Sequence, residues 1–164
     1  MEFLEQIISH ICNQAVFNVA VAKKNQTCLR KAVGCSITTC IGKRDMTQTI
    51  VAYNGSSRKG LPCTNVVGGC GCSHAEPRAV MQALRKSMKH GLMVCTYSPC
   101  TNCANIILDS KIIDVVVYDI LTEHDIRGAT FLEEAIDVVT LKDIEERKAD
   151  DILQKWIQNS RDNC

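Results

Sequence analysis

Two short motifs contain the residue types that hold and use a metal ion. The first is His-Ala-Glu at 74–76 and the second is Pro-Cys-Thr-Asn-Cys at 99–103. A catalytic zinc ion usually has three protein ligands and one position left open for water. Two cysteines separated by two residues at the start of a helix can bind one ion together, because the helix N-terminus favours thiolate. One histidine from a second helix would complete the set, so we expect His74, Cys100 and Cys103 to bind zinc.

A carboxylate next to this set indicates catalysis. Glu76 follows His74 by two residues, so it lies close to the ion without being needed as a ligand. Zinc lowers the pKa of bound water from about 15.7 toward 7, and a neighbouring carboxylate can move the proton. Either motif alone is weak evidence, but together and in this order they resemble the signature of zinc deaminases that act on nucleobases. We therefore expect Glu76 to be the catalytic acid–base, with a zinc that is only structural as the alternative.

The composition predicts one domain, residues 1–164, that is large enough to bury a core. Apolar residues make up 46% of the chain and charged residues 23%, as in ordinary globular proteins. No stretch of about 18 consecutive apolar residues exists, so we expect no membrane span. The first ten residues include Glu2 and Glu5 but no Lys or Arg, unlike a targeting segment, which favours the cytoplasm.

Charge and cysteine content favour a small-molecule substrate and a metal. A net charge of +1 and an aromatic content of 4% do not favour nucleic acid as a partner, since phosphates need basic residues and bases need stacking platforms. There are 11 cysteines in a chain without an export signal. Clustered cysteines then indicate metal binding, and scattered ones indicate core or surface thiols. We assign to the scattered group Cys12, Cys35, Cys40, Cys95 and Cys164.

Apolar periodicity predicts alternating strands and helices, which implies an α/β sandwich. We expect helices over 3–23, 77–89, 98–109, 130–135 and 141–157, and strands over 33–41, 49–53, 93–97, 114–118 and 136–141. Gly-Lys-Arg-Asp at 42–45 reads as a hairpin turn, Gly91 as a helix C-cap and Ser98 as a helix N-cap. The segment 54–73 is a long loop that needs something to order it.

The chain resembles the deoxycytidylate deaminase branch of the cytidine deaminase-like superfamily. The matching segments are Cys-Leu-Arg-Lys-Ala-Val-Gly at 28–34, Tyr-Asn-Gly at 53–55, the motif at 74–76, Thr-Tyr-Ser-Pro-Cys-Thr-Asn-Cys-Ala at 96–104 and Ile-Asp-Val-Val-Val-Tyr at 113–118. His74 argues against the free cytidine deaminase branch, where the first ligand is usually Cys. The resemblance implies a three-layer sandwich, with a mixed five-stranded sheet and helices on both faces. It also implies a homo-oligomer, with a hexamer as one form.

The resemblance also implies a reaction, the hydrolytic deamination of dCMP or a 5-substituted dCMP to the corresponding dUMP with release of ammonia. Water activated by the ion would attack C4 of the base, while Glu76 passes protons to N3 and to the departing amine. Asn54 resembles the family's contact to a sugar hydroxyl, although Asn-Gly is also common in turns. Ala75 and Ser98, which lie in the matching motifs, are expected substrate contacts as well.

A second, structural zinc site occurs in some phage members of the family. Its ligands lie before the first strand, in the loop after Tyr-Asn-Gly, and just before the histidine motif. The corresponding residues here are Cys28, Cys63, Cys70 and Cys72. Four thiolates would form a closed tetrahedral site that orders the loop. The alternative is four free thiols.

The sequence departs from the family pattern where substrate selection is expected. Arg78 replaces a common Asn, and Thr-Glu-His at 122–124 stands where an aromatic residue often faces the nucleotide. A guanidinium at 78 would bind a phosphate by two hydrogen bonds or pair with a carboxylate of a neighbouring subunit. Two other classes of function stay open: a deaminase of tRNA adenosine or single-stranded polynucleotides, and a non-catalytic zinc-binding module.

Overall fold

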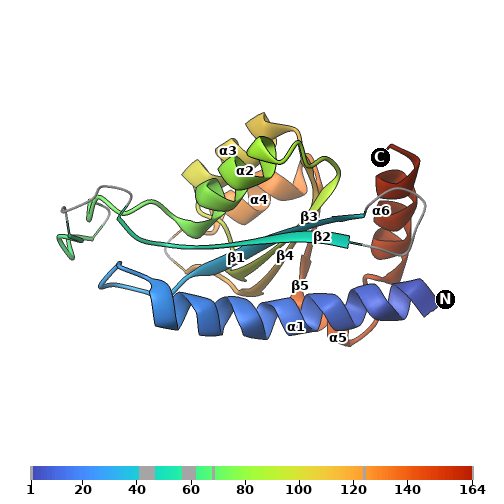
Figure 1. Ribbon diagram of the computed structural model, residues 1–164, viewed down its shortest axis with the longest axis horizontal. Helices are drawn as coiled ribbons and strands as arrows, with labels where there is room; N and C mark the ends of the chain where they lie inside the picture. Colours follow the sequence, from blue (N-terminus) through green and yellow to red (C-terminus); the bar gives the residue numbers. More distant parts are fainter. Residues whose placement is uncertain (1, 41–46, 57–61, 68, 124, 164) are drawn as a thin grey trace.

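Five strands form one mixed sheet at the centre of the molecule (Figure 1). The computed structural model describes residues 2–40, 47–56, 62–67, 69–123 and 125–163. The strands are β1 (Gly34–Cys40), β2 (Thr47–Tyr53), β3 (Gly91–Tyr97), β4 (Ile113–Ile120) and β5 (Asp137–Thr140). Their order is β2-β1-β3-β4-β5; β1 pairs antiparallel with β2 and β3, and β3, β4 and β5 are parallel. The expected fold class, a mixed five-stranded sheet between helices, is confirmed.

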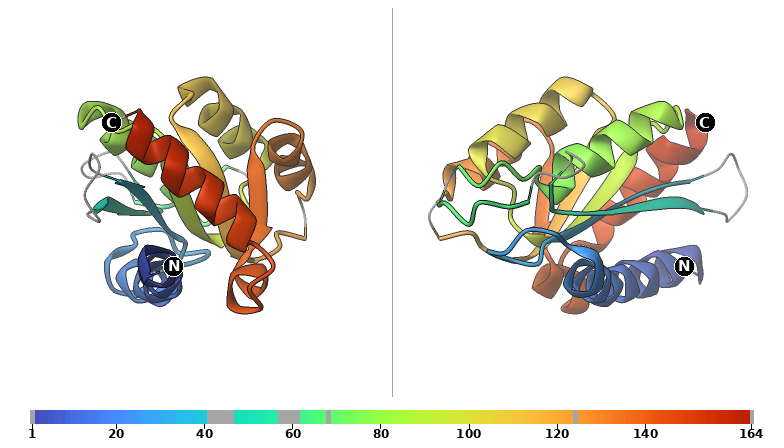
Figure 2. Two further views of the ribbon diagram at one scale, coloured as in Figure 1. Left: turned by 90° about the vertical axis from the view of Figure 1, so that its right-hand side faces the viewer. Right: turned by 60° about the vertical axis from the view of Figure 1, so that its left-hand side comes forward.

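Helices cover both faces of the sheet. They are α1 (Glu2–Asn25), α2 (Ala75–Arg85), α3 (Thr101–Ser110), α4 (Arg127–Glu133), α5 (Leu141–Glu145) and α6 (Asp150–Asp162). Helices α2, α3 and α4 lie on one face and α1 and α5 on the other, while α6 stands across one end of the sheet (Figures 1 and 2). None of the described helices has both the length and the apolar character that crossing a membrane requires.

Two hydrophobic cores form because neighbouring strand residues point to opposite faces of the sheet. On β3, Met93 and Cys95 belong to the core under α2 and α3, whereas Leu92 and Val94 belong to the core shared by α1, α5 and α6. The central strands are therefore apolar on both sides, as expected for strands covered by helices. This double burial explains the continuous valine run at 115–117 in β4.

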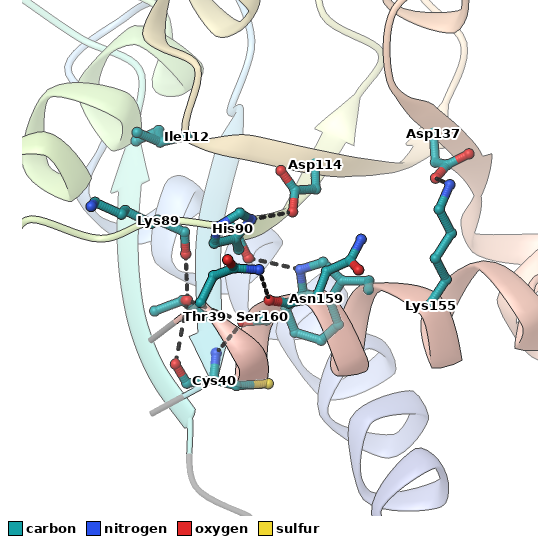
Figure 3. A network of polar contacts seen from close by, with 12 residues as sticks. Thr39, Cys40, Lys89, His90, Ile112, Asp114, Asp137, Lys155, Asn159 and Ser160 are labelled. Atoms are coloured by element: carbon teal, nitrogen blue, oxygen red, sulfur yellow. Dashed lines mark hydrogen bonds and ion pairs between the residues drawn. The ribbon is translucent and has the colours of Figure 1, made fainter. Parts of the chain in front are cut away.

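Buried polar contacts attach α1 and α6 to the sheet. The Asn18 side chain on α1 donates to Ser36 Oγ and to the Val94 carbonyl, both at 3.0 Å. On α6, Trp156 Nε1 donates to the His90 carbonyl at 2.8 Å. Figure 3 shows that Ser160 Oγ accepts from the Cys40 amide at 3.1 Å. The Trp156 and Ser160 bonds hold α6 at the end of the sheet where β3 begins and β1 ends.

Three local expectations are corrected by the structure. Gly91 does not cap a helix; α2 ends at Arg85, and Gly91 begins β3. A Cβ at position 91 would lie 2.8 Å from Ile37 Cγ2, so close packing explains this glycine.

Ser98 is not an N-cap, because α3 begins at Thr101 with Cys100 as its N-cap. The expected helix over 141–157 is interrupted after α5 at Arg147, whose φ is 62°.

The remaining elements appear near their expected positions. The first helix and the strands shift by a few residues at their ends, and α4 begins at Arg127 rather than at 130. The proposed hairpin turn at 42–45 lies outside the described residues. Ends of elements are where such shifts are expected, because tertiary contacts decide how far a helix or strand continues.

Candidate active site

Two helices begin side by side above the sheet, and their N-cap residues carry metal-ligand side chains. His74 is the N-cap of α2 and Cys100 is the N-cap of α3, and both have extended backbone. Neither side chain caps its own helix. His74 Nδ1 instead lies 3.3 Å from Cys103 Sγ and 3.6 Å from Cys100 Sγ. The two helix starts thus bring one imidazole and two thiols together.

This donor set fits a tetrahedral zinc ion. The three ligand atoms of His74, Cys100 and Cys103 lie within 4.8 Å of one another. Zinc–sulfur bonds of about 2.3 Å and zinc–nitrogen bonds of about 2.0–2.1 Å place tetrahedral ligands roughly 3.3–3.8 Å apart. The two distances from His74 Nδ1 to the sulfurs fall in this range. Three protein ligands leave a fourth position, as in catalytic zinc sites.

The two thiols have very different acidities, because they share a hydrogen bond. The contact with Cys103, and next the contact with His74, lowers the pKa of Cys100 to about 4. The same contact raises the pKa of Cys103, which burial raises further. Cys100 in turn raises the pKa of His74. The site therefore holds a thiolate at neutral pH, and a bound dication would favour deprotonation of the second thiol as well.

Glu76 lies in the first turn of α2 and is nearly fully buried, with 3% of its surface exposed. Burial raises the pKa of its carboxyl group, and the nearby Cys100 charge raises it further. Its Oε2 atom has no hydrogen-bond partner among the described residues. A buried polar atom without a partner is costly, so this oxygen is best explained by a functional role. A carboxyl group with a raised pKa can both donate and accept a proton near neutral pH.

A cavity of about 290 Å³ opens over these residues. It is lined by His74, Glu76 and Cys100 at the metal triad, and by Arg30 and Lys31 from the segment before β1. Its volume is near the lower end of the usual range for ligand pockets, about 300–1,000 Å³. The Lys31 ammonium lies over the ring of Tyr97, another lining residue, at 4.6 Å from the centroid. The lining of the cavity thus includes a buried acid and two exposed cations.

Two of the four expected substrate contacts line the cavity, and two do not. Asn54 lines it, and its amide accepts from the Val33 backbone at 2.9 Å and donates to the Lys31 carbonyl at 2.6 Å. Ser98 also lines it, and its Oγ accepts from the Thr122 amide at 2.8 Å. Ala75 is fully buried in the core beneath α2 and is not among the lining residues.

Arg78 is not among the residues that line this cavity. Its guanidinium donates to the carbonyls of Tyr53 and Ser56, at 2.7 and 3.2 Å, and it lines a separate surface cavity between β2 and α2. The structure therefore does not bring Arg78 together with the metal triad and Glu76.

Some lining residues were not singled out from the sequence. Arg30 and Lys31 lie within the segment 28–34 that resembles the family, and a basic pair shortly after Cys28 was a usable signal. Asp125 had no such signal. Its carboxylate accepts from the Thr101 amide at 2.8 Å and from the Thr101 hydroxyl at 2.7 Å, and so holds the start of α3. Only the fold brings this loop residue to the Cys100 helix end.

A second group of possible ligands lies beside the same cavity. The Sγ atoms of Cys28, Cys63, Cys70 and Cys72 lie within 4.8 Å of one another. Hydrogen bonds from the backbone amides of Leu29 and Asn65 lower the pKa of Cys63 to about 7. Burial, with the neighbouring thiols, raises the pKa of Cys72 to about 12. Four sulfurs with backbone N–H groups directed at one of them match the chemistry of a closed zinc site.

A metal triad at two facing helix starts, with a buried glutamate beside it, is the arrangement of zinc deaminases that act on nucleobases. Residues 11–119 match the family model described as the cytidine and deoxycytidylate deaminase zinc-binding region. The chain therefore belongs to this family, and the family expected from the sequence is confirmed. No curated protein matches the sequence significantly.

Solved structures with the same fold include deaminases with different substrates. A dCMP deaminase from the cyanophage S-TIM5, in complex with dCMP and dUMP, is 21% identical with a TM-score of 0.63, covering 82% of this chain and 96% of that chain. The Rib2 deaminase of Aspergillus oryzae is 14% identical with a TM-score of 0.56, covering 91% and 98%. A tRNA:A34 deaminase is 18% identical with a TM-score of 0.53, covering 80% and 97%. At these identities the likeness establishes the fold.

The low pKa of Cys100 predicts unusual reactivity in metal-free protein. Above pH 5 nearly all of this thiol is ionised, since its pKa is about 4. Its alkylation by iodoacetamide, followed by mass spectrometry after zinc removal, should therefore be almost independent of pH between 6 and 8. Cys12, whose pKa burial raises above 9.0, serves as the internal control, and its rate should rise about tenfold per pH unit. The same tenfold rise at Cys100 would contradict the assignment.

Proposed function

We propose that this chain is a deoxycytidylate deaminase, which hydrolyses dCMP or a 5-substituted dCMP to the corresponding dUMP and ammonia. The observation that carries the proposal is one cavity whose lining combines two kinds of chemistry. It is lined by His74 and Cys100 of the metal triad and by the buried Glu76, and also by the exposed cations Arg30 and Lys31. A pyrimidine nucleoside monophosphate has the matching polarity, with a neutral base at one end and a dianionic phosphate at the other.

Glu76 would carry the protons of the reaction. A zinc ion held by His74, Cys100 and Cys103 would supply Lewis acidity and lower the pKa of a water molecule. Glu76 in its protonated form, which burial favours, donates to N3 of the base and makes C4 more electrophilic. The carboxylate then takes a proton from the attacking water and returns it to the departing amine. One buried carboxyl group would thus perform every proton transfer of the reaction.

The cationic side of the cavity favours a monophosphate over a nucleoside. Arg30 and Lys31 are exposed, and the Tyr97 ring supports the Lys31 ammonium by a cation–π contact. Hydrogen bonds between charged partners are about twice as strong as neutral ones, so a phosphate would gain affinity here. The S-TIM5 enzyme, solved with dCMP and dUMP, supports the same substrate class. The net charge of +1 weighs against a polynucleotide, although a tRNA deaminase shares the fold.

The proposal includes a second, structural zinc. Cys28, Cys63, Cys70 and Cys72 offer four sulfurs, and three of them, all except Cys63, also line the substrate cavity. An ion there would join the segment before β1 to the loop between β2 and α2. It would thus hold the wall of the cavity that carries Arg30 and Lys31.

We also propose a homo-oligomer in a reducing compartment such as the cytoplasm. Exposed Met81, Leu84 and Ile106 lie on α2 and α3, which are neighbouring helices on one face. Apolar side chains in such a position favour contact with another subunit. A reducing compartment would keep the cysteine ligands as thiols.

Glu76→Gln should keep the metal but lose nearly all turnover, because the amide cannot accept and return protons. A loss of about 10²–10⁴-fold in kcat is expected from general acid–base chemistry. Ammonia release and zinc content, measured on the same preparation, check this. Glu145→Gln, a change of the same type on the exposed surface of α5, should have no effect. A Glu76→Gln protein with a tenth of normal turnover would refute the role.

Protein purified without added metal should contain two zinc ions per chain by elemental analysis. Cys28→Ser with Cys63→Ser should lower the ratio to one, because two of four ligands are lost. Cys12→Ser, outside both groups, should keep two. A ratio of one in the unaltered protein, with all four clustered thiols freely alkylated in the native state, would exclude the second site.

A panel of cytosine and adenine nucleosides, nucleotides and oligonucleotides, scored for ammonia, should show dCMP or a 5-substituted dCMP as the best substrate. Lys31→Ala should raise KM for dCMP about tenfold or more, since a hydrogen bond between charged groups contributes roughly 1.5–3 kcal/mol. Activity on deoxycytidine should be unchanged, and Lys24→Ala at the exposed end of α1 should change neither. Faster turnover of a single-stranded oligonucleotide than of any mononucleotide would overturn the substrate class.

A further inference from the structure

Arg78 connects the catalytic helix to the turn that follows β2. It lies on α2, one turn after His74, and its guanidinium reaches back over the end of the strand. Nη1 donates to the Tyr53 carbonyl at 2.7 Å and Nη2 donates to the Ser56 carbonyl at 3.2 Å. The same group lies 5.7 Å from the centroid of the Tyr53 ring, within cation–π distance. One side chain therefore holds both ends of the turn 53–56.

The residue inside this turn that faces the substrate cavity is Asn54. Its side chain is buried and lines the cavity. Asn54 also holds the segment before β1, because its amide bonds to the Lys31 carbonyl at 2.6 Å and to the Val33 amide at 2.9 Å. The turn held by Arg78 thus determines where Asn54 lies, and through Asn54 where the Lys31 backbone lies.

The same turn also supports the start of α2. Gly55 and Ser73 exchange two backbone hydrogen bonds, at 3.1 and 2.9 Å, and Ser73 directly precedes the ligand His74. A planar guanidinium can bond two carbonyls at a fixed separation, which a lysine ammonium cannot do. Arg78 therefore sets the distance between α2 and the turn, and it does so from the separate cavity between β2 and α2.

We propose that Arg78 is a positioning residue that orders Asn54 and the Lys31 segment for the substrate, and that it contacts no phosphate itself. This inference rests on the proposed deaminase function. Two observations carry it: the paired bonds to backbone carbonyls, and the placement of the guanidinium in a separate cavity between β2 and α2. It differs from both roles that the sequence suggested, the phosphate ligand and the partner of a carboxylate in another subunit.

The first test compares Arg78→Ala with Arg78→Lys and with Arg85→Ala. Arg85 lies on the same helix and lines the same outer cavity, so it is the matched control. Arg78→Ala should raise KM roughly tenfold for deoxycytidine, through the displaced Asn54, and at least as much for dCMP, with kcat changed less than about threefold. Arg78→Lys should recover only part of the loss, and Arg85→Ala should change nothing. A rise for dCMP alone would show that Asn54 stays in place without Arg78, and would overturn the proposal.

The second test asks whether Arg78 acts through Asn54. In an Asn54→Ala background, Arg78→Ala should add little further loss, because residues that act in one contact chain are not additive. Affinity for dCMP is measured by calorimetry in the Glu76→Gln background, so that binding is separated from chemistry. Fully additive losses would overturn the proposal, and so would a lower zinc content or a changed oligomer mass in Arg78→Ala.

The third test does not depend on activity. Hydrogen–deuterium exchange of the amides in 31–33 and 53–56 should become faster in Arg78→Lys and Arg78→Ala, while the exchange of β3 stays the same. Unchanged exchange rates in these segments would refute the positioning role of Arg78, even in an active enzyme. If the unaltered protein deaminates no cytosine nucleotide, the proposed function fails, whereas the exchange experiment still decides whether Arg78 orders the turn.

Discussion

The approach of two helix N-termini is the constraint on which the site depends. The starts of α2 and α3 carry partial positive charge, and they point toward one shared space. Such an arrangement is unfavourable unless negative charge lies between the helices. The low pKa of Cys100 supplies a thiolate in this position. The contact that creates the metal site therefore also relieves the repulsion between the helices that form it.

The sheet makes this approach possible, because it positions two segments that are separated in sequence. Helix α3 follows β3 after a short connection, whereas α2 follows a long segment after β2. Glu76 and Cys103 can be buried only because α2 and α3 pack on a continuous apolar face of the sheet. A buried carboxyl group with a raised pKa reduces stability, and the two hydrophobic cores offset that cost.

The wall of the cavity formed by the segment before β1 and the residues after β2 is held differently, mostly by polar atoms and sulfur. The clustered thiols, the Asn54 amide and the Arg78 guanidinium connect short segments that bury little apolar surface. Segments ordered in this way are sensitive to the loss of one contact, since few hydrophobic contacts remain to hold them. His74, Glu76 and Cys103 thus lie on helices that pack on the hydrophobic core, whereas the wall that carries Asn54 and Lys31 depends on local polar contacts.

Short-range spacing was sufficient to pair Cys100 with Cys103 and His74 with Glu76, because residues near one helix start are close in space whatever the rest of the chain does. The group of Cys28, Cys63, Cys70 and Cys72 was predicted only from the resemblance to the family, since its members lie on separate segments. Periodicity predicted alternating strands and helices, whereas the mixed five-stranded sheet was also an expectation from the resemblance. The break at Arg147, the packing reason for Gly91 and the partner of Arg78 depended on contacts between distant segments. From the sequence alone, the guanidinium of Arg78 could bond to any of several partners. The end of β2 became its partner only because α2 packs beside that strand.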